Sequence, residues 1–182
     1  RELGRLLGTT AFYVTGAGEG YADDILIDKD KNPNTAGVKE LVPNAKPLSA
    51  LLDDVRSGRV SQVIALGGVT PKNDPEDATA LGMLGTLVVV AAHEGALTEA
   101  AHVVLPAASW AEASGTYVNR QGIHQVAEKA LEPQGASKPA WDHVRALAKA
   151  LGLEPSWTKL KDVRGMLASA VVPSSPDVTA SA

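Results

Sequence analysis

Apolar residues occur along this chain in short continuous runs that alternate with segments of helical periodicity. Glycine, proline or polar residues bound each run, as is typical of strands buried in a parallel sheet. The expected strands are 10–15, 62–66, 86–91 and 102–105. This alternation predicts an α/β fold, with an open, mostly parallel sheet and flanking helices.

The segments between the runs carry helix signals. In 47–57 the apolar positions share one helical face, a proline stands near the start and Gly58 follows the end. Further helices are expected at 35–41, 74–81, 96–101, 138–151 and 159–168. A hairpin is expected over 117–126, turning at 120–122.

The pattern divides the chain into three parts. Residues 1–152 are expected to form the α/β domain and 153–170 a C-terminal helix. The Ser-, Pro- and Ala-rich residues 171–182 are expected to be a disordered tail. Because residues 1–8 read as the end of a helix and no Met precedes them, we expect a segment of a longer protein. A sheet edge left open by such a boundary would favour non-physiological self-association.

Composition narrows the function classes. The net charge of −4 is spread without a basic cluster, so nucleic acid is not an expected partner. Cysteine is absent, which excludes thiolate ligands for an iron–sulfur cluster within these residues. The longest apolar run, 84–92, is too short to span a bilayer, and no direct membrane insertion is expected.

A glycine-rich loop invites a nucleotide-binding interpretation. Gly16, Gly18 and Gly20 follow the first expected strand, but Tyr21 stands where a dinucleotide fingerprint needs its third glycine. The segment after the loop is charged and contains Asn-Pro-Asn rather than a helix signal. A turn is therefore favoured, and an autonomous small-ligand module using this loop and the loop after Leu66 remains an alternative.

The polar residues show no catalytic pattern. The histidines lack metal-ligand spacing, so no metal site is expected, and His102 is expected to be a packed or capped residue. Ser109 and Ser114 lack a nucleophile elbow. The carboxylate pairs 53–54 and 76–77 are expected on solvated helix faces. We therefore expect no catalytic residue in this chain.

Glu112, Thr116 and Asn119 crowd into one loop that is rich in donors and acceptors. These side chains either contact a ligand at the carboxyl edge of the sheet or bind the backbone of their own loop. The residues alone favour the second interpretation.

Several segments together resemble one family. Residues 101–106, ending in Leu-Pro, precede the spaced set Glu112-x-x-Gly115-Thr116-x-x-Asn119-x-x-Gly122-x-x-Gln125. This order is similar to that of the molybdopterin oxidoreductases, which include the large, G-type subunit of respiratory complex I. Residues 24–37 and 133–152 also resemble family segments, and 24–37 looks particularly like the complex I subunit.

The resemblance implies a Rossmann-like α/β domain of the formate dehydrogenase or DMSO reductase type. In cofactor-bearing members, loops at the strand ends hold a molybdopterin guanine dinucleotide. The matching positions here would be a vestigial form of that site: Gly68, Thr70, Glu112, Gly115, Thr116, Asn119 and Gln125.

This chain departs from the cofactor-bearing pattern at positions that are polar there. Thr70 replaces Asn or Asp, Ala91 replaces Asp and Ile123 replaces Arg, while Gly95 and Leu97 replace Thr and His102 replaces Asp. An unpaired buried polar group on a ligand costs ~1–3 kcal/mol, so such losses weaken a dinucleotide site. We expect molybdopterin to be absent.

The resemblance thus implies a segment of the large subunit of bacterial NADH-quinone oxidoreductase, which binds iron–sulfur clusters elsewhere in its chain and passes electrons from NADH toward quinone. This segment would be a non-catalytic scaffold that contacts other peripheral-arm subunits on the cytoplasmic side of the inner membrane. The alternative is a molybdopterin-binding segment of a molybdenum or tungsten oxidoreductase such as formate dehydrogenase.

Overall fold

The computed structural model describes residues 1–9, 11–16, 19–67 and 75–170. The helices are α1 (Glu2–Leu6), α2 (Thr35–Leu41), α3 (Leu48–Arg56), α4 (Pro75–Gly82), α5 (Ala96–Ala100), α6 (Ala140–Ala150) and α7 (Leu160–Ala170). The strands are β1 (Tyr13–Val14), β2 (Lys46–Pro47), β3 (Gln62–Leu66), β4 (Thr86–Ala91), β5 (Val103–Pro106), β6 (Gly115–Val118) and β7 (His124–Ala127). The expected tail at 171–182 lies outside the described residues.

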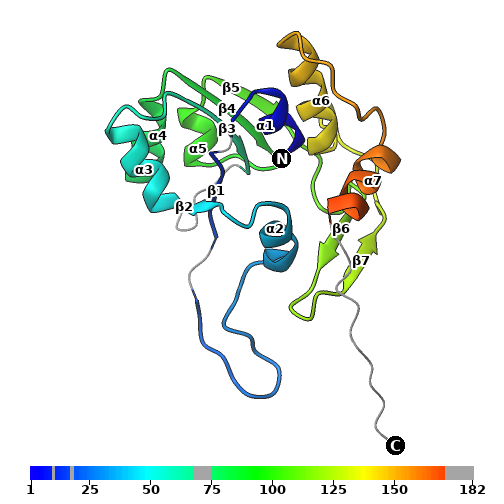
Figure 1. The fold of residues 1–182 in the computed structure, drawn as a ribbon. Helices are drawn as coiled ribbons and strands as arrows, with labels where there is room; N and C mark the ends of the chain where they lie inside the picture. The colour runs from blue at the N-terminus through cyan, green and yellow to red at the C-terminus, as the bar shows by residue number, and fades with distance from the viewer. Residues whose placement is uncertain (10, 17–18, 68–74, 171–182) are drawn as a thin grey trace, which may run out of the picture.

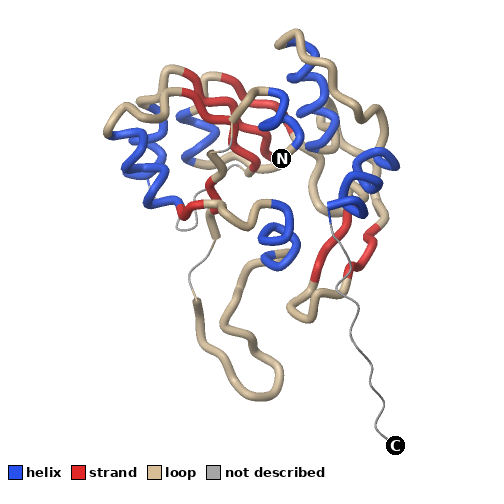
Figure 2. Tube along the Cα trace, viewed as in Figure 1, coloured by secondary structure: helices blue, strands red, loops and turns tan. Residues whose placement is uncertain are grey.

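The fold is mixed α/β, as the alternating pattern predicts, and its described strands are divided among three small sheets (Figure 2). The central one is parallel, with the order β3-β4-β5. A two-residue parallel pair joins β1 to β2, and β6 pairs with β7 as an antiparallel hairpin. The two parallel sheets lie near α3, α4 and α5, while the hairpin, α6 and α7 gather on the other side of the molecule (Figure 1).

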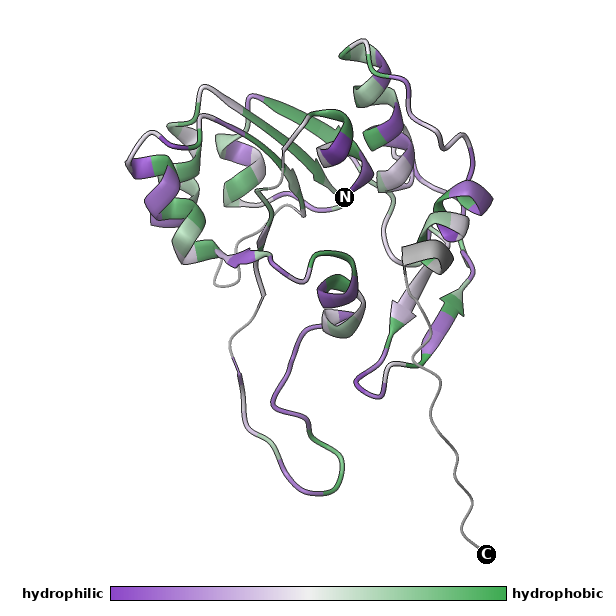
Figure 3. Ribbon diagram, in the orientation of Figure 1, coloured by the Kyte–Doolittle hydropathy of each residue, from purple (hydrophilic) through white to green (hydrophobic). Residues whose placement is uncertain are grey.

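Strand β4 forms the centre of the apolar core. Its residues from Leu87 to Ala91 are buried, and Leu87 and Val89 are fully inaccessible to solvent. Leucines of α3 and α4 pack against the strand, together with Leu97 of α5. The view coloured by hydropathy shows hydrophobic residues concentrated in this sheet (Figure 3). Continuous apolar sequence therefore produces a strand covered on both faces.

The expectation that the flanking strands are buried is wrong. Leu66 of β3 is 69% exposed, and Val103 and Val104 of β5 are each nearly half exposed. Both strands lie at the edges of the three-stranded sheet, and each pairs with β4 along one edge. An apolar run therefore identified each strand but did not indicate its place in the sheet.

The expectation that Asp54 is solvated on a helix face is also wrong. Asp54 is 8% exposed, and its carboxylate accepts hydrogen bonds of 2.6 Å each from Tyr13 Oη and Arg59 Nε. Lys46 Nζ lies 3.5 Å from the same group. These donors and charges lower the pKa of Asp54 to about 2. The carboxylate thus joins α3 to β1 and β2, whereas its neighbour Asp53 is exposed as expected.

Helix α6 connects the sheet to the hairpin side of the molecule. Its His143 is buried, and the ring Nε2 lies 2.7 Å from the carbonyl oxygen of Pro106 at the end of β5. Ala108 N donates a 2.8 Å hydrogen bond to Lys138 O just before the same helix. These contacts fix the point at which the chain leaves the sheet for the segment that resembles the family loop.

Candidate functional site

The carboxyl edge of the parallel sheet is where ligands bind in open α/β folds. Strands β3, β4 and β5 end there at Leu66, Ala91 and Pro106. Backbone hydrogen bonds continue past the strand ends, from Gly67 N to Val90 O (2.9 Å) and from Ala107 N to Ala91 O (2.8 Å). Two predicted vestigial positions at this edge, Gly68 and Thr70, lie outside the described residues.

Glu112, a third predicted position, binds its own loop. Its Oε2 accepts a 2.8 Å hydrogen bond from Ser109 N, and its own amide donates to Ser109 O at 3.1 Å. The hydrogen bonds from Ser109 lower the pKa of Glu112, because they stabilise the charged carboxylate. The geometry matches the interpretation in which this side chain satisfies local backbone.

Asn119 has the same kind of role at the tip of the hairpin. Its Oδ1 accepts hydrogen bonds of 2.9 Å from both Gln121 N and Ile123 N, and its amide donates to Ile123 O. Gly122 closes the turn with a φ of +78°, a conformation that glycine adopts without strain. Asn119 therefore shapes the turn between β6 and β7.

The predicted residues on the hairpin do not converge on one point. Gly115 and Asn119 are separated by the length of β6, about 13 Å at roughly 3.3 Å per residue. Thr116 is paired with Val126, and Gln125 with the next residue, Tyr117. Thr116 and Gln125 therefore project from opposite faces of the hairpin. The family pattern in this region specifies a hairpin rather than a cluster of side chains.

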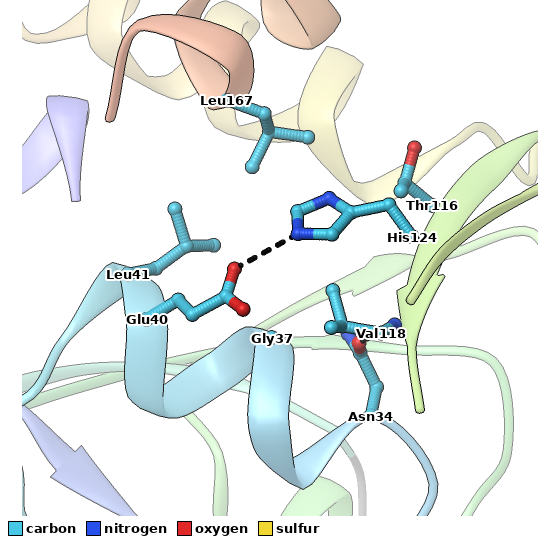
Figure 4. Close-up of a pocket in the computed structure, with 8 residues that line it drawn as sticks. All are labelled: Asn34, Gly37, Glu40, Leu41, Thr116, Val118, His124 and Leu167. Atoms are coloured by element: carbon cyan, nitrogen blue, oxygen red, sulfur yellow. Dashed lines mark hydrogen bonds and ion pairs between the residues drawn. The ribbon is translucent and has the colours of Figure 1, made fainter. Parts of the chain in front are cut away.

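The hairpin does bound a small cavity of about 30 Å³, together with α2 and α7 (Figure 4). Thr116, Val118 and His124 line one side. The remaining lining residues are Asn34, Gly37, Glu40, Leu41 and Leu167. The ring Nε2 of His124 lies 3.2 Å from Glu40 Oε2 across the cavity. The volume suits about one water molecule and is too small for an organic ligand.

Asn34 and Gly37 hold the hairpin against α2. Asn34 takes a left-handed backbone conformation, with a φ of +62°, and its Oδ1 accepts a 2.7 Å hydrogen bond from Val118 N. A Cβ added at Gly37 would lie 2.4 Å from that same Oδ1 and 2.9 Å from Val118 Cγ2. Only glycine fits there without displacement. We call the contact of Asn34 and Gly37 with Val118 the α2–hairpin clasp.

Sequence reasoning missed this clasp, although both of its segments stood out. Residues 24–37 and 115–125 belong to separate parts of the family resemblance. The Asn-Pro-Asn turn followed by Gly37 was the available signal, but nothing in it indicates a partner 84 residues away.

The remaining polar candidates also have structural partners. His102 is exposed rather than packed, and its Nδ1 accepts a 3.1 Å hydrogen bond from Leu87 N, as in the capped alternative. Within the part of the chain that the structure describes, no three His, Asp or Glu side chains are grouped to hold a metal ion. Within the same part, no helix has the length and hydropathy needed to cross a membrane.

The glycine-rich loop after β1 leads into a long irregular segment. Gly20 N donates a 2.9 Å hydrogen bond to Lys29 O, which closes this segment on itself. Among the described residues that follow, the first helix is α2, which begins at Thr35. No helix N-terminus in that described stretch is placed to receive a pyrophosphate after this loop, and Gly18 lies outside the described residues.

A molybdopterin guanine dinucleotide needs many polar partners, and the described residues that follow the strands at the carboxyl edge are a mixture of alanine and polar residues. Ala92, His93 and Glu94 follow β4 and are exposed, and Ala107 and Ala108 follow β5. A larger cavity, of about 300 Å³, lies at the opposite, amino edge. Its walls include Val55, Gly58, Val60, Ser61, Met83, Leu84 and Gly85.

Comparison with known proteins agrees with the resemblance in the sequence. The G-type subunit of the NADH-quinone oxidoreductase of Rickettsia conorii is 39% identical over 84 residues, which are 46% of this chain and 12% of that protein. The mitochondrial 78 kDa subunit of the NADH-ubiquinone oxidoreductase of Candida albicans is 30% identical over 117 residues, 64% of this chain and 15% of that protein. The G-type subunit of Rickettsia felis is 43% identical over 68 residues, 37% of this chain and 10% of that protein.

The chain thus spans between 10% and 15% of the length of these relatives. The profile of the molybdopterin oxidoreductase family matches residues 30–150, which include α2, the three-stranded sheet, the hairpin and α6. On this match the chain belongs to the molybdopterin oxidoreductase family.

Proposed function

We propose that this chain is a scaffold segment of the large, G-type subunit of NADH-quinone oxidoreductase, without a redox centre of its own. In this proposal the complete subunit carries iron–sulfur clusters outside these residues and takes part in electron transfer from NADH toward quinone. The similarity to G-type and 78 kDa subunits from two groups of organisms supports the assignment.

The observation that carries the scaffold role is the use of polar side chains in the family-like loop. Glu112 and Asn119 have the positions and chemistry of ligand-binding groups, yet their oxygens accept hydrogen bonds from neighbouring backbone amides. Local hydrogen bonds of this kind account for these side chains without a ligand, which supports the scaffold role. The segment is thus suited to hold a shape rather than a cofactor.

In this proposal the β3-β4-β5 sheet is part of a larger Rossmann-like sheet of the formate dehydrogenase or DMSO reductase type. The exposed edge strands support this, because β3 and β5 both carry apolar side chains that further strands or helices would cover. Residues 1–152 would belong to that domain and 153–170 to a helical extension. The positions that match the vestigial cofactor site keep the backbone architecture only.

Metal analysis of the complete protein tests the absence of molybdopterin. We expect purified protein to contain iron but no molybdenum or tungsten in stoichiometric amount. One molybdenum or tungsten per protein would overturn the scaffold proposal and favour the alternative of a cofactor-binding segment, as in a formate dehydrogenase. A ligand that binds only the native state raises the thermal unfolding midpoint. Because we expect no binding, added molybdopterin guanine dinucleotide should leave that midpoint unchanged.

The proposal places the protein on the cytoplasmic side of the inner membrane, in contact with other peripheral-arm subunits. Native purification tests this placement. We expect the complete protein to co-purify with an NADH-binding flavoprotein subunit and to sediment as part of a large assembly. Recovery as a free monomer under conditions that preserve the assembly would contradict it.

A further inference from the structure

A long loop between β1 and α2 projects away from the sheets and helices (Figure 1). Two pairs of contacts join the two sides of this loop near its base. Gly20 N donates to Lys29 O at 2.9 Å, and Lys29 Nζ lies 3.0 Å from Glu19 Oε1. Lys31 Nζ donates hydrogen bonds to two carbonyl oxygens of the loop, those of Tyr21 (2.6 Å) and Asp28 (2.5 Å). The loop is therefore a closed, internally bonded structure.

Residues 23–28, here called the acidic tip, are held in one conformation by Asp23. Its Oδ1 accepts hydrogen bonds from the amides of Ile25 (2.9 Å), Leu26 (2.7 Å) and Ile27 (2.8 Å). Its own amide donates to Ile27 O at 2.9 Å, completing the turn. These donors stabilise the charged carboxylate and so lower the pKa of Asp23.

This ordered turn presents apolar side chains to solvent. Ile25 is 85% exposed and Leu26 is 90% exposed, and Ile27 is also exposed. The tip of the loop is a hydrophobic segment on an otherwise hydrophilic arm (Figure 3). A conformation that is fixed by four hydrogen bonds and exposes consecutive large aliphatic residues is preorganised for contact, because little entropy remains to be lost on binding.

The charged residues of the acidic tip indicate which kind of surface can bind it. Asp23 and Asp24 precede the apolar residues along the chain and Asp28 follows them, while the neighbouring Lys29 is paired with Glu19. Arg120 of the hairpin pairs with Asp28 at 2.5 Å, and within the described residues Asp24 has no ion-pair partner. The tip thus has an apolar centre and an anionic rim, which is the anatomy of a protein interface. An anionic membrane surface would repel the same rim.

We propose that the acidic tip docks into an apolar pocket with a basic rim on another subunit of the same assembly. This inference rests on the proposed function, which supplies the assembly. Leu26 and Ile25 enter the pocket, Asp24 pairs with a cation beside it, and the contact between Arg120 and Asp28 orients the loop relative to the hairpin.

The test uses the complete protein in its native cell, with the photo-crosslinking residue p-benzoylphenylalanine in place of Leu26. Irradiation should join the protein to one other subunit of the purified assembly, at a peptide that contains Lys or Arg beside apolar residues. Cross-links confined to a remote part of the same chain, to a second copy or to lipid would each overturn the proposal, as would the absence of any cross-link.

Substitutions give an independent measurement. Ile25→Ser combined with Leu26→Ser should lower recovery of the cross-linked subunit on the order of tenfold, because truncating central apolar residues of an interface has the largest effects. Asp24→Lys should lower it further when added to that pair. The matched control is Trp110→Ser, which removes a side chain that is 79% exposed on a different loop. It should leave recovery unchanged.

The thermal unfolding midpoints of all variants should match that of the wild type, since the altered side chains are exposed. Equal losses from the tip and control variants would overturn the proposal, and so would full recovery with the tip variant. If the wild-type protein itself co-purifies with no other subunit, the proposed function fails and this partner class fails with it. If the wild type co-purifies and the tip variant does so equally well, the docking inference alone fails.

Discussion

The two sides of this molecule are held together by different forces. Around β4, leucine, valine and alanine side chains from α3, α4 and α5 form a continuous buried cluster. Around the hairpin, the contacts between segments are mainly individual polar ones, from Asn34 to Val118 N, from Glu40 to His124 and from Asp28 to Arg120. Val118 is the buried apolar residue of the hairpin.

The difference teaches where sequence change should be tolerated. Hydrophobic burial is non-directional, so the β4 side depends on volume, and apolar residues of similar size can replace one another. The hairpin side depends on atoms in fixed positions, so its tolerance varies sharply from one residue to the next.

The largest expected effect comes from the apolar side. Leu87→Ala should lower the free energy of unfolding by about 2–5 kcal/mol, because it leaves a cavity at a fully buried position. Denaturant unfolding followed by circular dichroism measures the change. The control is Met83→Ala, at a side chain that is 81% exposed, with an expected change of about 0.5 kcal/mol or less. Equal effects of the two variants would contradict the assignment of the core.

The second largest effect is expected at Gly37, where a substitution should destabilise the hairpin side of the molecule and leave the β4 side intact. Gly37→Ala places a Cβ against Asn34 and Val118 and should cost about 1–3 kcal/mol through local overpacking. Hydrogen exchange should become faster at the amide of Val118 while the amides of β4 keep their protection. Gly165→Ala is the matched control, because nothing lies within 4 Å of its added Cβ in α7, and it should stabilise by about 0.5–1 kcal/mol. If hydrogen exchange became faster by the same factor at the amides of β4 and of the hairpin, the two sides of the molecule would unfold together.

Asp54→Asn tests a contact on the β4 side of the molecule whose stabilising effect requires a charged carboxylate. The amide can still accept from Tyr13, but its NH₂ group would face the donor of Arg59, so the variant should be less stable at neutral pH. The pKa of Asp54 is lowered from 3.8 to about 2 in the folded state. Its contribution is therefore complete above pH 4 and is lost as the pH falls toward 2.

Other carboxylates titrate in this range, so the informative quantity is the difference between wild type and variant. That difference should shrink between pH 4 and pH 2 in thermal unfolding experiments. Asp53→Asn, at the exposed neighbour, should show a much smaller difference throughout. A constant difference for Asp54→Asn across this pH range would argue against a charged Asp54 in the folded state.

The smallest effect is expected for Arg120→Ala. The ion pair joins the exposed Arg120 to the partly exposed Asp28, and pairs at the surface contribute little because solvent and salt screen them. The unfolding midpoint should be unchanged within error, in low salt and in 1 M salt alike. A loss comparable to that of Gly37→Ala would mean that this surface pair, rather than the α2–hairpin clasp, holds the hairpin side together.

Local sequence predicted most of the elements but not their environment. The bounds expected for α2, β3 and β4 agree with the structure, because apolar runs and turn residues act over a few positions. The exposure of β3 and β5 depends on strand order, which no run of residues encodes. Asp54 was expected to be solvated because it is charged, yet its partners include Tyr13 and Lys46, outside its own helix.

The candidate site shows the same limit of local information. Glu112 and Asn119 bind backbone within four residues, and the loop sequence alone favoured that interpretation. The contact of Asn34 with Val118 joins segments that read as unrelated, so only the folded chain brings it into view.

That separation along the chain has a consequence for the order of folding. The β6–β7 hairpin closes a turn of a few residues and can form early, whereas the hydrogen bond from Val118 N to Asn34 closes a loop of 84 residues. The entropy of closing a loop grows with its length, so this contact is gained only after the intervening sheet has already brought its ends together. A contact that completes assembly is also the first to open. Brief detachment of the hairpin, with β4 still intact, should therefore be the lowest excited state of the native protein.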